Sequence, residues 1–194
     1  MHRIVWTMAR IMAVFGGFVL LALVLLTCVS ILGRMLNGLL NGDFLQTVAP
    51  RFSDWALAFG VGPILGHVEI VEAGVAFAIF AFLPLCQLSG VHAKVSLVTD
   101  RLSCPVRRWL IAGIDTIFAA TLILIAWRLS EGLVEKREFS ETSFMLQFPI
   151  WWAYAASLVA AITAVIAGLY IATVRIAEAV TGKDRLVTDQ GPVG

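Results

Sequence analysis

Charged residues are scarce in this chain. Only 14% of its 194 residues are Asp, Glu, Lys or Arg, while 60% are hydrophobic and the mean hydropathy is +0.92. A soluble globular domain carries about 25% charged residues. The composition therefore excludes an ordinary soluble domain and predicts a membrane protein. The net charge of +1, without a basic cluster, gives no support to a nucleic-acid partner.

The chain also lacks the motifs of metal, disulfide and hydrolase chemistry. Its three cysteines are Cys28, Cys86 and Cys104, an odd number without C-x-x-C spacing. No Walker loop, H-E-x-x-H or G-x-S-x-G sequence is present. We therefore expect no metal, no cofactor and no enzymatic activity.

Four stretches are long and apolar enough to cross a bilayer as helices. They are residues 11–33, 68–89, 109–128 and 149–174. The first holds 23 uncharged residues, or about 34 Å of helix. The predicted fold is an all-α integral membrane domain of four transmembrane helices, residues 1–180, with a polar, disordered tail at 181–194. Pro84 predicts a kink in the second span, and Pro149 suits the first turn of the fourth.

The distribution of Lys and Arg predicts the orientation. With the N-terminus in the cytoplasm, nine of the 14 basic residues fall in inner segments and five in outer ones. We therefore expect both termini inside, with Trp151 and Trp152 as aromatic anchors at the outer surface. In the first outer connection, residues 44–59, apolar residues recur at helical spacing. This pattern predicts an amphipathic helix flat on the outer surface; a loop packed on the bundle is the alternative.

Three acids interrupt the spans, and acids in membrane helices are costly enough to suggest a function. Glu69 and Glu72 share one helix face at the outer end of the second span. They form either a proton or cation site, together with His67, or interfacial acids that pair with a basic residue or a partner subunit. Asp115 lies toward the inner side, roughly 13 Å from Glu72 in depth. No ionisable residue of this chain is expected between them, which leaves Asp115 open to a basic partner from another protein.

The predicted inner loop carries His92, followed by Arg107 and Arg108. Imidazole can act as a pH switch or a metal ligand. Because no second ligand stands at metal spacing, His92 is interpreted as a capping or headgroup contact. Arg107 and Arg108 are expected to touch lipid phosphates at the inner surface.

Small residues recur every four positions in the fourth span, at Ala156, Ala160, Ala164 and Gly168. An adjacent row consists of Ala153, Ser157 and Ala161. Rows of small residues let helix backbones approach closely. This predicts a tight seam, either within the bundle or against a partner helix. The alternative is an alanine-rich helix with no special face.

A further set of residues follows the order of the predicted spans. Arg34 stands near the end of the first span and Glu72 near the start of the second. The inner loop contains Gly90, His92, Val95, Asp100, Arg101 and Leu102, and the fourth span begins with Pro149, Trp151, Trp152 and Tyr154. In this order, these residues resemble the small, Q-type (DctQ-like) subunit of the tripartite ATP-independent periplasmic (TRAP) transporters, and the resemblance covers about Val29 to Tyr170. Lys94 and Ser96 depart from the family, which more often has a branched apolar residue and an acid there.

The resemblance implies a non-catalytic, multi-pass scaffold subunit of an ion-gradient-driven importer, a symporter, in a bacterial inner membrane. In such a transporter, a periplasmic binding protein captures an organic acid such as a C4-dicarboxylate, or a related solute. A large M-type subunit carries the solute and sodium sites and moves like an elevator. The small subunit packs against its static part.

Within that assembly, residues 68–89 and 149–174 are expected to contact the large subunit. The outer segments 43–59 and 131–148 are expected to border the docking site of the binding protein. The candidate contacts with a subunit or with membrane lipids are Glu69, Asp115, Arg107, Arg108, Ala156, Ala160, Ala164 and Gly168.

The alternative function is a stand-alone small proton-coupled transporter that uses Glu72 and Asp115. It predicts transport by liposomes containing this chain alone, and loss of that transport in Glu72→Gln. A membrane enzyme acting on lipids would need an acid, base or metal cluster at one depth, which the sequence does not show.

Overall fold

The computed structural model describes residues 2–42, 51, 60, 62, 64–89 and 104–181. In these parts the chain is all-α, apart from an isolated β-bridge between Thr142 and Pro149. Its helices are α1 (His2–Leu40), α4 (His67–Ser89), α6 (Cys104–Glu138) and α7 (Trp151–Thr181). All four are long and apolar enough to cross a membrane, which confirms the predicted all-helical class.

The helices extend beyond the predicted spans, because apolar composition marks the part of a helix that suits hydrocarbon rather than its ends. α1 starts nine residues before the predicted span and runs to Leu40, where the Asn41 side-chain amide donates to the carbonyl oxygen of Asn37 at 2.9 Å. α6 continues well past Arg128 to Glu138 and has Pro105 in its first turn. Only α4 begins and ends within a residue of the predicted span.

The two prolines of the predicted spans differ in role. Pro149 is not part of α7, contrary to prediction, because it pairs with Thr142 in the β-bridge. Its carbonyl oxygen accepts the N–H of Trp152 at 3.2 Å and so opens the first turn of the helix. Pro84 is buried inside α4, which continues through it.

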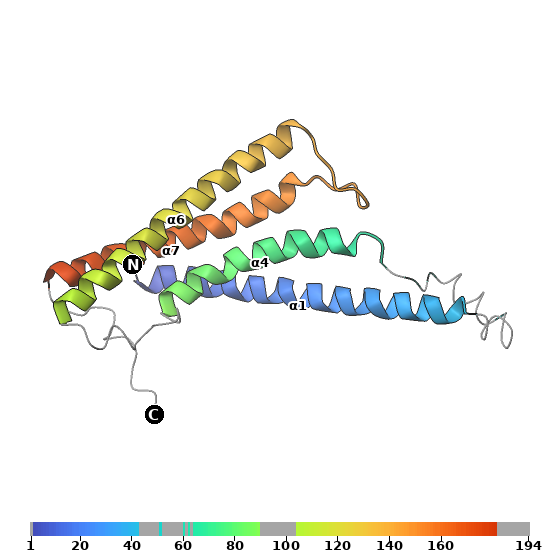
Figure 1. Cartoon of the computed structure of the whole chain (residues 1–194), viewed down its shortest axis with the longest axis horizontal. Coiled ribbons are helices and arrows are strands. Elements are labelled where there is room, and N and C mark those ends of the chain that lie inside the picture. Colours follow the sequence, from blue (N-terminus) through green and yellow to red (C-terminus); the bar gives the residue numbers. More distant parts are fainter. Residues whose placement is uncertain are drawn as a thin grey trace, which may run out of the picture.

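The helices form two antiparallel pairs, α1 with α4 and α6 with α7, joined by packing of α4 on α7 (Figure 1). In this view the pairs lie close at the end where α1 and α6 begin, and they diverge toward the other end. α4 and α7 are therefore the inner helices, and α1 and α6 flank them. The wedge between α4 and α7 at the wide end holds the site described below.

Small residues make the helix contacts possible. A Cβ on Gly16 of α1 would lie 2.8 Å from the Cβ of Ala81 in α4. A Cβ on Gly168 of α7 would lie 3.1 Å from Gln87 Oε1 of α4 and 3.2 Å from Leu122 of α6. Both glycines thus allow a backbone approach that a larger residue would prevent.

The predicted row of small residues in α7 divides into two parts. Ala160, Ala164 and Gly168 are buried inside this chain, whereas Ala156 is exposed. Ser157 and Ala161 of the adjacent row are buried as well. The seam therefore lies within the bundle, where α7 meets α4 and α6.

We expect Ala160→Leu to destabilise the isolated chain by about 1–3 kcal/mol, because extra methylenes at a fully buried position overpack the seam. Ala156→Leu is the matched control, on the same row but exposed, and should leave stability nearly unchanged. Thermal unfolding of the purified chain in detergent measures both. Equal effects of the two substitutions would contradict a seam within the chain.

Candidate functional site

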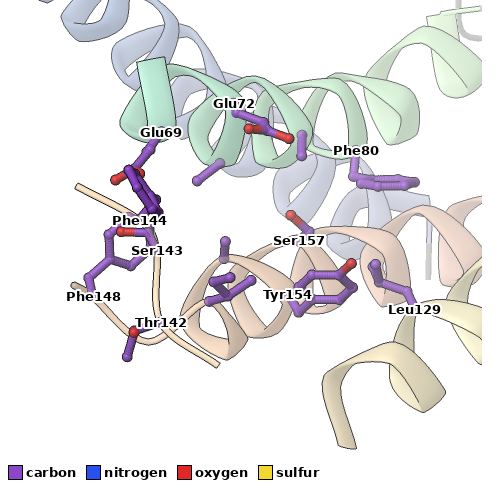
Figure 2. Close-up of a pocket in the computed structure, with 14 residues that line it drawn as sticks. Glu69, Glu72, Phe80, Leu129, Thr142, Ser143, Phe144, Phe148, Tyr154 and Ser157 are labelled. Atoms are coloured by element: carbon purple, nitrogen blue, oxygen red, sulfur yellow. The ribbon is translucent and has the colours of Figure 1, made fainter. Parts of the chain in front are cut away.

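A cavity of about 580 Å³ lies in the wedge between α4 and α7 (Figure 2). α4 supplies Glu69, Glu72, Ala73, Ala76 and Phe80; α6 supplies Leu129; α7 supplies Ala153, Tyr154 and Ser157. The rest of the wall comes from the connection between α6 and α7: Thr142, Ser143, Phe144, Phe148 and Ile150. We call this space the outer cavity, since it lies at the predicted outer end of the bundle.

The connection Phe139–Ile150, here called the outer hairpin, folds back on itself. The N–H of Ser143 donates to the carbonyl oxygen of Phe148 at 2.9 Å. At its base, the ammonium of Lys136 at the end of α6 donates to the Glu141 carboxylate at 2.7 Å. These bonds give the segment a defined shape, with Phe144 at the tip 88% exposed.

Glu69 ties the outer hairpin to α4. Its carboxylate accepts the backbone N–H of Met145 at 2.7 Å and that of Leu146 at 3.0 Å. Gly66, just before α4, has φ +78°, and a Cβ there would lie 2.5 Å from Cγ of Leu146. Glycine is therefore needed at this position, both for the left-handed backbone and for the space. Glu69 acts as a structural acceptor for a turn distant in sequence.

Glu72, one turn farther along α4, is exposed along the cavity wall. Its carboxylate and the hydroxyl of Ser157 point into the space between α4 and α7 (Figure 2). No hydrogen bond or ion pair joins Glu72 to any residue in the described parts of the chain. Both acids therefore line the same cavity, but Glu69 is hydrogen-bonded to backbone amides, whereas Glu72 has no such partner among the described residues.

His67 does not join the two acids. Its Nδ1 lies 2.8 Å from the carbonyl oxygen of Ile64 and 3.1 Å from Oγ of Ser30 in α1. Since a carbonyl oxygen only accepts, Nδ1 carries the proton in the contact with Ile64. His67 thus fastens the start of α4 to α1 and does not line the outer cavity.

A second polar cluster lies toward the opposite end of α7. The Arg175 guanidinium donates to the Glu178 carboxylate at 3.1 Å and lies 3.6 Å from the Asp115 carboxylate of α6. The Glu178 side chain is only 3% exposed, and those of Asp115 and Arg175 are about a quarter exposed. Asp115 therefore has a basic neighbour within its own chain, whereas the sequence had left it open to a basic partner from another protein.

The sequence contained a signal for this cluster. Arg175 directly follows the last apolar run, and α7 continues beyond it to Thr181. Arg175 and Glu178 are three residues apart and so share a helix face. An Arg–Glu pair at the end of one span, beside a neighbouring span with a single acid, was a reason to expect an ion pair between the helices.

The remaining candidate residues are dispersed. Arg34 lies within α1 and is exposed, as is Arg107 near the start of α6, where Arg108 is partly covered. Trp151 and Trp152 stack edge to face, with ring centroids 6.0 Å apart.

Several predicted features lie outside the described residues. They are the loop residues Gly90, His92, Val95, Asp100 and Arg101, the tail from residue 182, and the predicted flat helix at 44–59 apart from Arg51. Among the described residues, no three His, Cys, Asp or Glu side chains are grouped to hold a metal.

We expect Glu69→Ala to speed hydrogen exchange of the Met145 and Leu146 amides by roughly tenfold or more, since losing a charged acceptor costs about 1.5–3 kcal/mol per bond. Exchange measured by mass spectrometry on the outer hairpin tests this. Glu131→Gln, which removes an exposed partner of Arg128, is the control. Unchanged protection at both amides would show that Glu69 does not hold the hairpin.

Asp115 and Arg175 should be energetically coupled. Asp115→Asn and Arg175→Met should each destabilise the chain, and the double variant should lose less than their sum, with a coupling of about 1 kcal/mol. Unfolding of the four proteins in detergent completes the double-mutant cycle. Strict additivity would mean that the 3.6 Å approach contributes nothing to stability.

Comparison with known proteins identifies the family. A family model described as "Tripartite ATP-independent periplasmic transporters, DctQ component" matches residues 55–181. No significant match was found among curated proteins or among solved structures. The match includes α4, α6, α7, the outer hairpin and both polar clusters, and it covers well over half of the chain. The chain therefore belongs to the DctQ component family of the tripartite ATP-independent periplasmic transporters.

Proposed function

We propose that this chain is the non-catalytic scaffold subunit of a TRAP importer. The observation that supports this most directly is how little of its apolar surface the chain covers by itself. In the most apolar windows of α1, α4 and α6, 17% of residues are buried within the chain, against 50% in α7. Three long apolar helices thus offer their faces to lipid and to another membrane subunit, as an anchor for a moving partner requires.

The large M-type subunit would pack on the side of α7 that this chain leaves open. Val159, Ile162, Ile166 and Leu169 are exposed there and recur at helical spacing. They lie opposite the buried small residues Ala160 and Ala164, so one helix serves two contacts. Exposed apolar residues of α4, such as Ile79, would extend this surface.

The other parts of the assembly follow from the family and from the charge distribution. Both termini would lie in the cytoplasm of a bacterial cell, and residues 1–180 would form one membrane domain. The outer segments, including the outer hairpin, would border the docking site of the periplasmic binding protein. Solute recognition, for an organic acid or related compound, and coupling to an ion gradient would belong to the partner proteins.

The alternative, a stand-alone proton-coupled transporter, has less support. Glu72 lines the outer cavity beside Ser157, whereas Asp115 approaches Arg175. Ser157 and Arg175 are eighteen residues apart in α7, or about 27 Å along the helix. A proton passed between the two acids would have to cross that length of a seam built mainly from alanine and glycine.

Affinity purification of the tagged chain from native membranes in mild detergent tests the proposal. We expect roughly equimolar recovery of one large multi-span membrane protein, because the exposed apolar faces are matched to a partner. Liposomes containing the chain alone should show no solute uptake, with or without Glu72→Gln. Recovery of the chain alone, or Glu72-dependent uptake by it, would overturn the scaffold role.

A further inference from the structure

The outer cavity has features of a ligand site that a scaffold does not need. We propose that it binds an ammonium group carried by an amphiphilic molecule, with the charge at Glu72 and the apolar chain along the floor of the cavity. This binding is independent of the scaffold role, since the cavity is formed within one chain.

The first argument is charge. Glu72 lies five residues after the start of α4, about 7 Å along a membrane-spanning helix, where an uncompensated carboxylate is costly. The Glu69 carboxylate already accepts two backbone N–H groups. No Lys or Arg is found among the described residues that line the cavity. Glu72 is therefore the acceptor that remains for a cation from outside the chain.

The second argument is shape. A volume of about 580 Å³ falls in the range of ligand pockets, roughly 300–1,000 Å³. Ala73 and Ala76 leave the space open, and Phe80 and Leu129 make its far end apolar. The cavity is thus polar near Glu72 and apolar below it. An ion without a chain would leave that apolar part unfilled.

The third argument comes from the side chains around the charged end. Ser143 is 8% exposed and lines the cavity, and its hydroxyl stands beside the Glu69 carboxylate. Glu69 therefore has acceptor contacts within the chain, which leaves Glu72 as the carboxylate that faces the open part of the cavity. The aromatic rings of Phe144, Phe148 and Tyr154 stand in the same wall, and ring faces attract ammonium groups.

The chemistry excludes an anionic headgroup as the preferred ligand. A headgroup that carries a negative charge but no ammonium would meet the two carboxylates of Glu69 and Glu72 and no basic residue of the cavity wall. A primary ammonium supplies three donors for the Glu72 carboxylate and neighbouring hydroxyls. The ammonium could come from the headgroup of phosphatidylethanolamine or from a free long-chain amine.

Native mass spectrometry of the full chain, purified in detergent, tests the proposal. The probes are phosphatidylethanolamine, phosphatidylglycerol with the same acyl chains, and dodecylamine. We expect the wild-type chain to bind phosphatidylethanolamine about tenfold more tightly than phosphatidylglycerol, because only the ammonium can donate a charge-assisted hydrogen bond to Glu72. Glu72→Gln should remove that preference. Glu131→Gln, an acid outside the cavity, should keep it.

A second variant tests the contribution of the cavity's space to binding while the charge of Glu72 is kept. Ala76→Leu keeps Glu72 but fills the floor of the cavity, and it should also weaken phosphatidylethanolamine binding. If dodecylamine displaces the lipid, the site accepts any ammonium amphiphile; if it does not, the site is specific for the lipid. Either result supports the proposal.

Two results would overturn it. One is equal binding of the two phospholipids by the wild-type chain, or binding that Glu72→Gln leaves unchanged. The other is no binding of any ammonium probe, together with loss of the large membrane partner from Glu72→Gln in the affinity purification. That result would assign the cavity to a basic side chain of the partner and not to an amphiphile, and it would leave the scaffold role intact.

Discussion

Helices in a bilayer gain little from hydrophobic burial against one another, because lipid tails are as apolar as leucine. They associate when their backbones come close enough for extensive van der Waals contact. In this chain α7 meets that constraint, with a buried face of Ser157, Ala160, Ala164 and Gly168 that lets α4 and α6 approach. The two helix pairs are joined through this face, and both polar clusters depend on the alignment it creates.

The polar clusters show two ways of satisfying charged side chains near the ends of apolar helices. At the outer end, Glu69 accepts two backbone N–H groups of the outer hairpin, which orders a turn at the level where α4 begins. At the other end, Arg175 lies between Glu178 of its own helix and Asp115 of α6. The first cluster joins a side chain to backbone amides, and the second joins charged side chains to one another. Both fix the positions of helix ends in an otherwise apolar bundle.

Much of the architecture was predictable from the sequence, because apolar runs of this length have few alternatives to a membrane helix. The four helices and the membership of the DctQ family were both anticipated. The exact helix ends were not, since α1 and α7 continue through charged residues that an apolar window excludes.

The site was less predictable than the fold. Glu69 and Glu72 were recognised as acids on one helix face, but nothing in residue types indicates that one of them binds backbone groups 76 and 77 residues away. The pairing of Asp115 with Arg175 required knowing that α7 is helical beyond residue 174. A contact between a side chain and the backbone of a residue far along the chain is therefore the hardest kind to predict from a sequence.

The length of α1 has a further consequence. Its 39 residues correspond to about 58 Å, nearly twice the thickness of the hydrocarbon layer. Arg10 and Arg34 are both exposed on this helix and lie about 36 Å apart along its axis, so one arginine can reach the headgroups of each leaflet. In a bilayer, α1 would therefore be held at a set depth from both sides. In a thinner or thicker bilayer it would have to change its tilt, and α4, packed along it, would tilt with it.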